Sequence, residues 1–311
     1  MEELELEQNE QLLEQRRLRR LEQKRRRKTQ QRMVLGLLAL IVVLALVLIV
    51  RGCRAKPAPA PVEPSAPAEP VDTAAPTEPE ADSVVQLTAV GDIMIYDDIL
   101  AAAQTAEGVY DFTDCFSAVA AYTMAADLTV GNLELNFCGA PYTGKPDFRA
   151  PEALAGTLRD IGFDVLQTAN TYSIQNGMTG LSGTISALDA VGIDHVGTYA
   201  TQAERDASGG VLVKTVNSVR IAFIAFTKGV NNLTLPEGSE FAVDLLYTDY
   251  DSDYSKVAQD AIVQTAKNAA ATDADIVIAM LHWGSEYDNT ITDTQKKIES
   301  LLLENGVDVI L

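Results

Sequence analysis

The stretch Val84-Val-Gln-Leu-Thr-Ala-Val-Gly-Asp-Ile-Met94 decides the fold of this chain. It is an apolar, β-branched run that ends in a glycine and an acidic residue, Asp92. That pattern predicts a buried parallel strand with one carboxylate at its carboxyl end. Open α/β sheets bind their ligands outside the carboxyl ends of their strands. We therefore expect Asp92 to mark a ligand-binding edge, to which later strands bring further groups.

From Val84 onward, apolar β-type runs alternate with helical stretches, which predicts a layered α/β domain over residues 84–311. The predicted strands are 84–90, 127–131, 163–168, 193–196, 211–215, 219–226, 275–281 and 307–311. The predicted helices are 114–126, 151–161, 179–191, 254–271 and 292–304. The strands at 211–215 and 219–226 are joined through Asn217-Ser218, which predicts an antiparallel hairpin.

The sequence before Val84 has three parts of different composition. Residues 1–32 are highly charged and lack Gly and Pro, which predicts a solvated cytoplasmic helix. Residues 33–50 are an uninterrupted apolar segment, long enough to cross a bilayer as one helix. Residues 51–83 are rich in Ala, Pro and Glu and predict an extended extracytoplasmic linker. A cleaved signal peptide is the rival interpretation of the apolar segment, but no small-residue cleavage site follows it.

The charged residues are unevenly distributed. The net charge is −20, and 13 of the 24 Lys and Arg residues lie before residue 57. Ten of them precede the apolar segment, so the positive-inside rule places the N-terminus in the cytoplasm and residues 84–311 outside. The acidic composition of those residues argues against nucleic acid as a partner. Three cysteines are too few for a disulfide scaffold, although Cys115 and Cys138 could pair outside the cytoplasm.

Four predicted strand ends carry side chains that suit a metal ion. They are Gly91-Asp92, Gly131-Asn-Leu-Glu134, Thr168-Ala-Asn-Thr-Tyr172 and His282-Trp-Gly-Ser-Glu-Tyr287. Carboxylate, amide oxygen and imidazole together suit Mn, Fe, Zn or Mg. Because Asp and Asn are also ordinary turn residues after a strand, the prediction depends on all four ends occurring together. The candidate metal ligands are Asp92, Asn132, Glu134, Asn170 and His282. We expect the other histidine, His195, to be a hydrogen-bonded loop residue.

These motifs resemble the capsule-synthesis proteins of the CapA type, a family implicated in bacterial poly-γ-glutamate production. The resemblance runs from about Val84 to Leu311. It is carried by Val90-Gly-Asp-Ile-Met94, Asn132-Leu-Glu134, Phe148-Arg-Ala-Pro151 with Gly162-Phe-Asp-Val165, Gly192-Ile-Asp-His195 with Gly197-Thr198, and His282-Trp-Gly-Ser-Glu-Tyr287. The family is similar to calcineurin-like metallophosphatases, which implies a two-layered β core flanked by helices and a possible dinuclear metal site. The resemblance implies Asp92, Glu134 (or Asn132) and His282 as metal ligands.

Two departures from the family pattern bear on catalysis. Family members show Ala-Asn-Asn-His where this chain has Ala169-Asn-Thr-Tyr172, so Tyr172 occupies the position of the family histidine. A phenol with an ordinary pKa of about 10 is a poorer acid–base group near neutral pH than imidazole. The family pattern also continues beyond a strand such as 307–311 into a Gly-His-His-Pro-His motif. We therefore expect this domain to be truncated at its C-terminus.

The sequence supports two main hypotheses about function. In the first, a membrane-anchored extracytoplasmic protein acts in capsule, poly-γ-glutamate or related envelope polymer biosynthesis as a metal-dependent hydrolase or transferase. In the second, the same fold is a catalytically degenerate module that binds or assembles the polymer. In both hypotheses the partner is an anionic envelope polymer or its synthesis machinery. Both also predict that residues 33–50 contact the lipid bilayer. Whether the chain is an enzyme is left open by the altered motif. A third hypothesis is an anchor that organises a membrane complex through residues 1–50.

Overall fold

The computed structural model describes residues 83–311, which fall within one compact unit of the chain, Thr77–Leu311. Within them, the first sheet contains four parallel strands in the order β1-β4-β5-β6. These strands are β1 (Leu87–Ile93), β4 (Leu128–Leu133), β5 (Val165–Gln167) and β6 (Asp194–Val196). β4 is buried along its whole length, as expected for a central parallel strand, whereas β1 forms an open edge. The predicted parallel α/β core is therefore confirmed.

The second sheet has the strand order β10-β9-β8-β7. Its strands are β7 (Leu212–Val216), β8 (Val219–Thr227), β9 (Ile276–His282) and β10 (Val309–Ile310). β8, β9 and β10 are parallel, and β7 pairs antiparallel with β8. The turn between β7 and β8 is Asn217-Ser218, and both residues have positive φ, as a two-residue type I′ hairpin requires. The predicted hairpin is confirmed.

The two sheets pack face to face through an apolar cluster. Its buried members are Leu128, Val130, Val165 and Val196 from the first sheet and Ile221, Phe223, Ala225, Ile278 and Met280 from the second. The intervening residues of β8, Ala222, Ile224 and Phe226, pack in a separate cluster that includes helical residues. Because successive side chains of a strand point to opposite faces, β8 is buried on both sides. Its nearly continuous apolar sequence follows from that burial.

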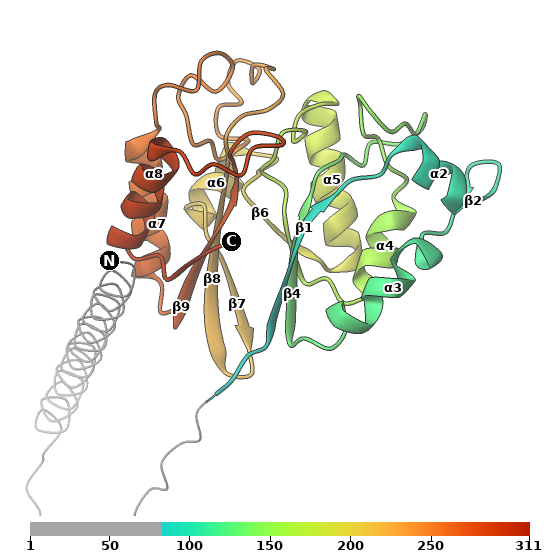
Figure 1. Ribbon diagram of the computed structural model, residues 1–311, viewed down its shortest axis with the longest axis horizontal. Coiled ribbons are helices and arrows are strands. Elements are labelled where there is room, and N and C mark those ends of the chain that lie inside the picture. The colour runs from blue at the N-terminus through green and yellow to red at the C-terminus, as the bar shows by residue number, and fades with distance from the viewer. Residues whose placement is uncertain (1–82) are drawn as a thin grey trace, which may run out of the picture. The chain divides into compact units, whose positions relative to one another are not determined.

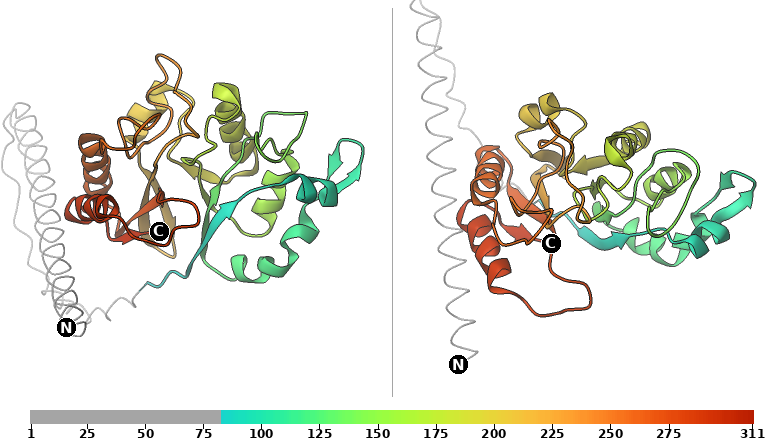
Figure 2. Two further views of the ribbon diagram at one scale, coloured as in Figure 1. Left: turned by 45° about the horizontal axis from the view of Figure 1, so that its top comes forward. Right: turned by 90° about the horizontal axis from the view of Figure 1, so that it is seen from above.

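Helices cover the outer face of each sheet, so that four layers lie side by side (Figure 1). The first sheet is covered by α2 (Asp97–Ala103), α3 (Thr113–Thr123), α4 (Ala153–Asp160) and α5 (Gly177–Val191). The second is covered by α7 (Gln259–Ala271) and α8 (Asp293–Glu304). Figure 2 shows that α7 and α8 lie on the opposite side of the sheets from α4 and α5. The short helix α6 (Gln202–Ser208) precedes β7, and a small hairpin, β2 (Gln104–Ala106) and β3 (Val109–Tyr110), follows α2.

The helix expected at 254–271 has the largest boundary error. It begins at Gln259, because the residues before it form a closed loop. The carboxylate of Asp249 accepts hydrogen bonds from the backbone N–H groups of Ser255 and Lys256, at 3.0 and 2.9 Å. Tyr254 also has a positive φ, which a helix does not allow. The helix expected at 114–126 ends at Thr123.

Two further sequence predictions concern the membrane span and the cysteines. The predicted membrane span, 33–50, and its flanking segments lie outside the described residues. Between residues 83 and 311, no helix is long and apolar enough to cross a bilayer. Cys115 and Cys138 are both free thiols, so the pairing that the sequence left open is not formed in this structure.

Candidate metal centre

Three of the predicted strand ends bring ligand-type side chains together. Asp92 lies in β1, Glu134 directly follows β4, and His282 ends β9. Each offers one ligand atom, and the three atoms all lie within 4.8 Å of one another. Two of the residues come from the first sheet and one from the second, so the packing of the sheets creates the cluster. We call Asp92, Glu134 and His282 the triad.

A β-bulge in β1 sets the position of Asp92. Ala89 pairs with Val130 and Asp92 pairs with Asn132, so Val90 and Gly91 together lie opposite a single residue of β4. Bulges of this kind re-aim side chains and are frequent beside active sites. The extra residue means that Asp92, and not Gly91, is paired with Asn132 at the carboxyl end of the sheet.

The triad is buried on one side and open on the other. His282 Nε2 lies 3.3 Å from Glu134 Oε1 and 4.0 Å from Asp92 Oδ1. The side chain of Glu134 is 6% exposed, whereas that of Asp92 is 50% exposed. Two carboxylates and an imidazole are a donor set that fits a divalent metal such as Mn, Fe or Zn. The exposed side at Asp92 leaves room for further ligands from solvent or substrate.

The proton on His282 is stabilised by the two carboxylates. Burial alone would lower the pKa of His282. The hydrogen bond to Glu134, with the negative charges of Glu134 and Asp92, outweighs burial and raises that pKa above its ordinary value. In the metal-free protein His282 therefore keeps its proton up to a higher pH than a free imidazole does. A metal ion must displace this proton, which makes its binding pH-dependent.

Thr227 lies behind the imidazole of His282. Its hydroxyl donates a hydrogen bond to the carbonyl of Gly229 at 3.0 Å, and the same oxygen lies 3.5 Å from His282 Nδ1. Since the hydroxyl proton is used on Gly229, Thr227 can only accept at Nδ1. This arrangement places a proton on Nδ1 and directs Nε2 toward the carboxylates, as in metal-binding histidines.

The predicted ligands Asn132 and Asn170 lie beside the triad and are linked to it by hydrogen bonds. Asn132 Nδ2 donates to Asp92 Oδ1 at 2.8 Å, and Asn170 Nδ2 donates to Asn132 Oδ1 at 3.0 Å. Asn170 Oδ1 in turn accepts from the backbone N–H of Tyr172 at 3.0 Å. Both amide oxygens therefore have hydrogen-bond donors in this structure. Metal coordination by these two residues stays a prediction.

Tyr172 borders the triad as part of an aromatic cluster. Its ring packs edge-on against Phe148, with ring centroids 4.6 Å apart, and Phe148 packs against Tyr96 at 5.1 Å. Burial raises the pKa of Tyr172, and the charges of Glu134 and Glu286 raise it further. The hydroxyl is therefore protonated at neutral pH, where it can donate a hydrogen bond but cannot act as a base. The sequence predicted Tyr172 at the site but missed Tyr96 and Phe148.

His195 is separate from the triad, and its expected setting is wrong. It lies within β6, where it pairs with Leu166, and not in a loop. Its Nδ1 has no hydrogen-bond partner among residues 83–311. Burial lowers the pKa of His195, and the charges of Asp189, Glu204 and Asp194 oppose this effect without cancelling it. His195 is a neutral strand residue at neutral pH.

Comparison with known proteins identifies a family that matches most of this chain. The family model for the bacterial capsule synthesis protein PGA_cap matches residues 86–311. The chain is 25% identical over 242 residues to the PGA biosynthesis protein CapA of Bacillus subtilis, an alignment that covers 74% of this chain and 57% of that protein. It is 27% identical over 165 residues to the capsule biosynthesis protein CapA of Bacillus anthracis, covering 52% and 37%.

A third relative, an uncharacterized protein of Sinorhizobium fredii, is 32% identical over 119 residues, which are 35% of this chain and 25% of that protein. The chain spans less than two thirds of the length of each of these relatives. The family model, by contrast, covers the whole of both sheets, including all three triad residues. Because that match extends over more than half of the sequence, this chain belongs to the PGA_cap family of bacterial capsule synthesis proteins.

Proposed function

We propose that residues 84–311 bind a divalent metal ion through Asp92, Glu134 and His282. The observation that carries this proposal is the approach of three ligand atoms to within 4.8 Å of one another at the meeting edge of two sheets. The buried Glu134 fits this proposal, since a buried carboxylate needs a cationic partner, and either His282 when it is protonated or a metal ion can be that partner. The ion would supply Lewis acidity toward a phosphoryl or acyl oxygen.

We further propose that the protein acts in the biosynthesis of capsule, poly-γ-glutamate or a related anionic envelope polymer. Support comes from membership of the PGA_cap family and from the two Bacillus relatives, which are named for capsule and PGA biosynthesis. A hydrolase or transferase activity on a metallophosphatase-like fold fits the two helix-covered sheets and the triad. The polymer and its synthesis machinery are the proposed partners.

Charge gives a physical reason for a metal at this place. Without a metal ion, the negative charges of Asp92 and Glu134 would repel an anionic polymer from the edge of the sheets, and Glu286 would add to that repulsion. A bound cation is often the largest local charge in such a site and would reverse its sign. In that arrangement Asp92 and Glu134 hold the ion, Thr227 orients the imidazole of His282, and the protonated Tyr172 donates a hydrogen bond to the substrate.

The membrane topology is part of the same proposal. We propose that residues 33–50 span the membrane once, with residues 1–32 in the cytoplasm and the metal-binding domain outside. Residues 51–83 would form the linker, which at about 3.1 Å per residue can reach several nanometres from the bilayer. This arrangement places the triad where an exported polymer is assembled. Cysteine accessibility on either side of the membrane tests it: labelling of Cys115 from inside the cell would overturn it.

A second candidate function is that of a polymer-binding or assembly module without catalysis. The specific observation in its favour is Tyr172, whose raised pKa leaves no base at the position of the family histidine. In this case the metal would neutralise the site and help to hold the anionic chain. The two candidates differ in turnover and not in metal content.

The metal content of the full-length protein, purified in detergent, tests the main proposal. We expect at least one Mn, Fe, Zn or Mg ion per chain by elemental analysis, and its loss in His282→Ala. His195→Ala is the matched control, because it removes the other histidine, which lies away from the triad. Less than one ion per chain, unchanged by His282→Ala, would overturn the metal site.

Turnover separates the two candidates. The metal-loaded protein is incubated with poly-γ-glutamate, and both chain cleavage and retention of the polymer are measured. Cleavage by the wild type that His282→Ala abolishes identifies the enzyme. Retention without cleavage, with no gain of activity in Tyr172→His, identifies the binding module.

A further inference from the structure

We infer that Asn132 and Asn170 are positioning residues that hold Asp92 in place, and that neither of them contacts the metal ion. This inference rests on the proposed metal site and gives these two asparagines a role different from the ligand role that the sequence predicts. It is drawn from the direction of each hydrogen bond in the chain Tyr172–Asn170–Asn132–Asp92, which we call the amide relay.

The orientation of the Asn170 amide is fixed on both sides. Asn170 is fully buried. Its Oδ1 accepts from the backbone N–H of Tyr172 at 3.0 Å. Its Nδ2 donates to the carbonyl of Leu133 at 2.7 Å and to Asn132 Oδ1 at 3.0 Å. Turning the amide over would place nitrogen against an N–H donor and oxygen against two acceptors, so only this orientation satisfies the buried groups.

The orientation of Asn170 determines that of Asn132. Since Asn132 Oδ1 accepts from Asn170, the nitrogen of Asn132 is the atom that faces Asp92 Oδ1, at 2.8 Å. An amide N–H donates hydrogen bonds and cannot bind a cation. Asn132 therefore presents an N–H donor to Asp92. This donor can hold a metal-binding carboxylate in place, but it cannot itself coordinate the metal ion. An ionised carboxylate can accept about four hydrogen bonds, so Asp92 keeps free positions for an ion.

Asp92 needs such support because of its location. It lies on the edge strand β1, after the bulge, and half of its side chain is exposed. Glu134 is buried and His282 is backed by Thr227, so Asp92 is the triad member with the fewest surrounding atoms. The amide relay connects it to the protein interior.

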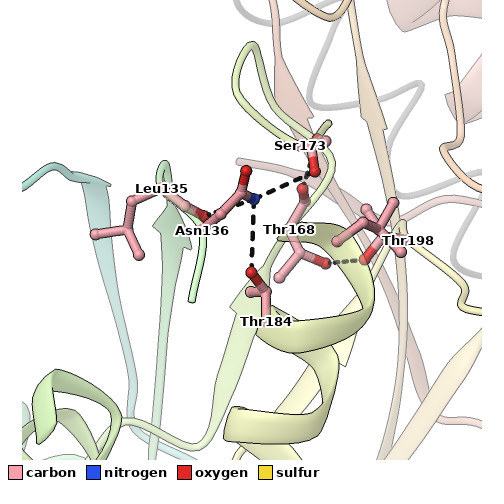
Figure 3. A pocket seen from close by; sticks show the side chains of 7 residues that line it. Leu135, Asn136, Thr168, Ser173, Thr184 and Thr198 are labelled. Carbon is pink, nitrogen blue, oxygen red and sulfur yellow. Dashed lines mark hydrogen bonds between the residues drawn. The ribbon is translucent and has the colours of Figure 1, made fainter. Parts of the chain in front are cut away.

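The inner end of the relay is anchored by the loop after β5. Asn170 N donates to Ser173 Oγ at 2.8 Å, and Ser173 Oγ donates to the carbonyl of Thr168 at 2.7 Å. Ser173 and Thr168 also line a small polar pocket (Figure 3). There Asn136 Nδ2 donates to the carbonyl of Ser173 at 3.2 Å, and the hydroxyls of Thr168 and Thr198 are 2.6 Å apart. This buried network fixes the backbone that holds Asn170.

The test uses Co²⁺ as a probe with the full-length protein, because its visible absorption reports the number and type of its ligands. In Asn132→Leu we expect Co²⁺ affinity to fall by about 10–100-fold, the usual effect of losing a residue that orients a metal ligand. At saturating Co²⁺ the absorption spectrum should equal that of the wild type. Asn268→Leu is the matched control and should change neither quantity. Asn268 lies in α7, and its amide donates to the carbonyl of Gly209, away from the triad.

Each outcome decides a different point. A changed spectrum at saturation in Asn132→Leu would show that the amide is a ligand and would overturn the inference while keeping the metal site. Unchanged affinity would overturn it as well. Absence of Co²⁺ binding by the wild type would overturn the metal site itself, and the inference with it. If Asn132→Leu does not fold, as judged by thermal unfolding, Asn132→Thr replaces it, since its hydroxyl is too short to bond Asp92 as the amide does.

Discussion

Replacing Thr227 with valine should weaken metal binding without removing any proposed ligand. Valine has nearly the volume of threonine but lacks the hydroxyl that donates to Gly229 and faces His282 Nδ1. Thr227 is fully buried, so no water would replace its hydroxyl as the hydrogen-bond partner of the Gly229 carbonyl and of His282 Nδ1. Loss of a partner that orients a metal-binding histidine weakens affinity by about 10–100-fold. This corresponds to about 1.4–2.8 kcal/mol of binding free energy.

The same substitution should also destabilise the metal-free protein. A buried donor or acceptor left unsatisfied costs about 1–3 kcal/mol. We expect the lower end of this range, because the contact of the donor, His282 Nδ1, with Thr227 is long at 3.5 Å. Thr129→Val is the matched control. Thr129 is equally buried and donates to the carbonyl of Thr123 at 2.7 Å, but it lies near the start of β4, at the opposite end of the sheet from the triad.

Isothermal titration with Mn²⁺ and thermal unfolding of the metal-free proteins measure the two effects separately. We expect both variants to unfold at lower temperature than the wild type and only Thr227→Val to bind Mn²⁺ more weakly. Equal Mn²⁺ affinity in the two variants would refute the reasoning that Thr227 orients the imidazole. A loss of Mn²⁺ affinity in Thr129→Val as large as that in Thr227→Val would also refute it.

Three further predictions follow from the fold and the triad. Gly183→Ala should lower the unfolding free energy by about 1–3 kcal/mol, because a Cβ there would collide with the carbonyl oxygen of Phe137. Gly156→Ala in α4, where an added Cβ meets no atom within 4 Å, should leave the unfolding free energy unchanged or raise it by up to about 1 kcal/mol. Chemical denaturation of the two variants measures both effects. The unfolding free energy of the wild type should fall relative to that of His195→Gln as pH drops below about 6.5, because the lowered pKa of His195 means that the unfolded chain takes up the proton first. A constant difference between pH 5 and pH 8 would contradict this. Divalent metal at about 100 times its dissociation constant should raise the unfolding free energy by about 2.7 kcal/mol in the wild type and not in His282→Ala, as measured by thermal shift.

The sequence predicts most of this fold because its strands are buried. Runs such as Val219–Thr227 are apolar on both faces, which leaves few alternatives to a central strand. The sequence did not predict α6, because this helix buries no residue and so lacks the periodic pattern of apolar residues that marks a helix. A signal was present nevertheless: Thr201 and Glu204 form a capping box, with Thr201 Oγ1 accepting from the N–H of Glu204 at 3.2 Å.

The candidate site was predictable only in part. The strand ends predicted Asp92 and Glu134 at one edge, because the parallel strands of a sheet end at a common edge. His282 joins them from the second sheet, through a packing of two sheets that the strand pattern does not show. The bulge at Val90-Gly91 depends on pairing with β4 and has only a glycine as a local signal. The directions of the hydrogen bonds of Asn132 and Asn170 depend on three-dimensional neighbours, so residue type alone favoured them as ligands.

The triad also joins two halves of the polypeptide. Asp92 and Glu134 belong to the sheet that is complete by Val196, and His282 belongs to the sheet that begins at Leu212. A chain divided between these strands would give two fragments, neither of which carries the full set of ligands. Metal affinity regained on mixing would therefore report fragment complementation, and it would make the ion a sensor of correct assembly between the two sheets.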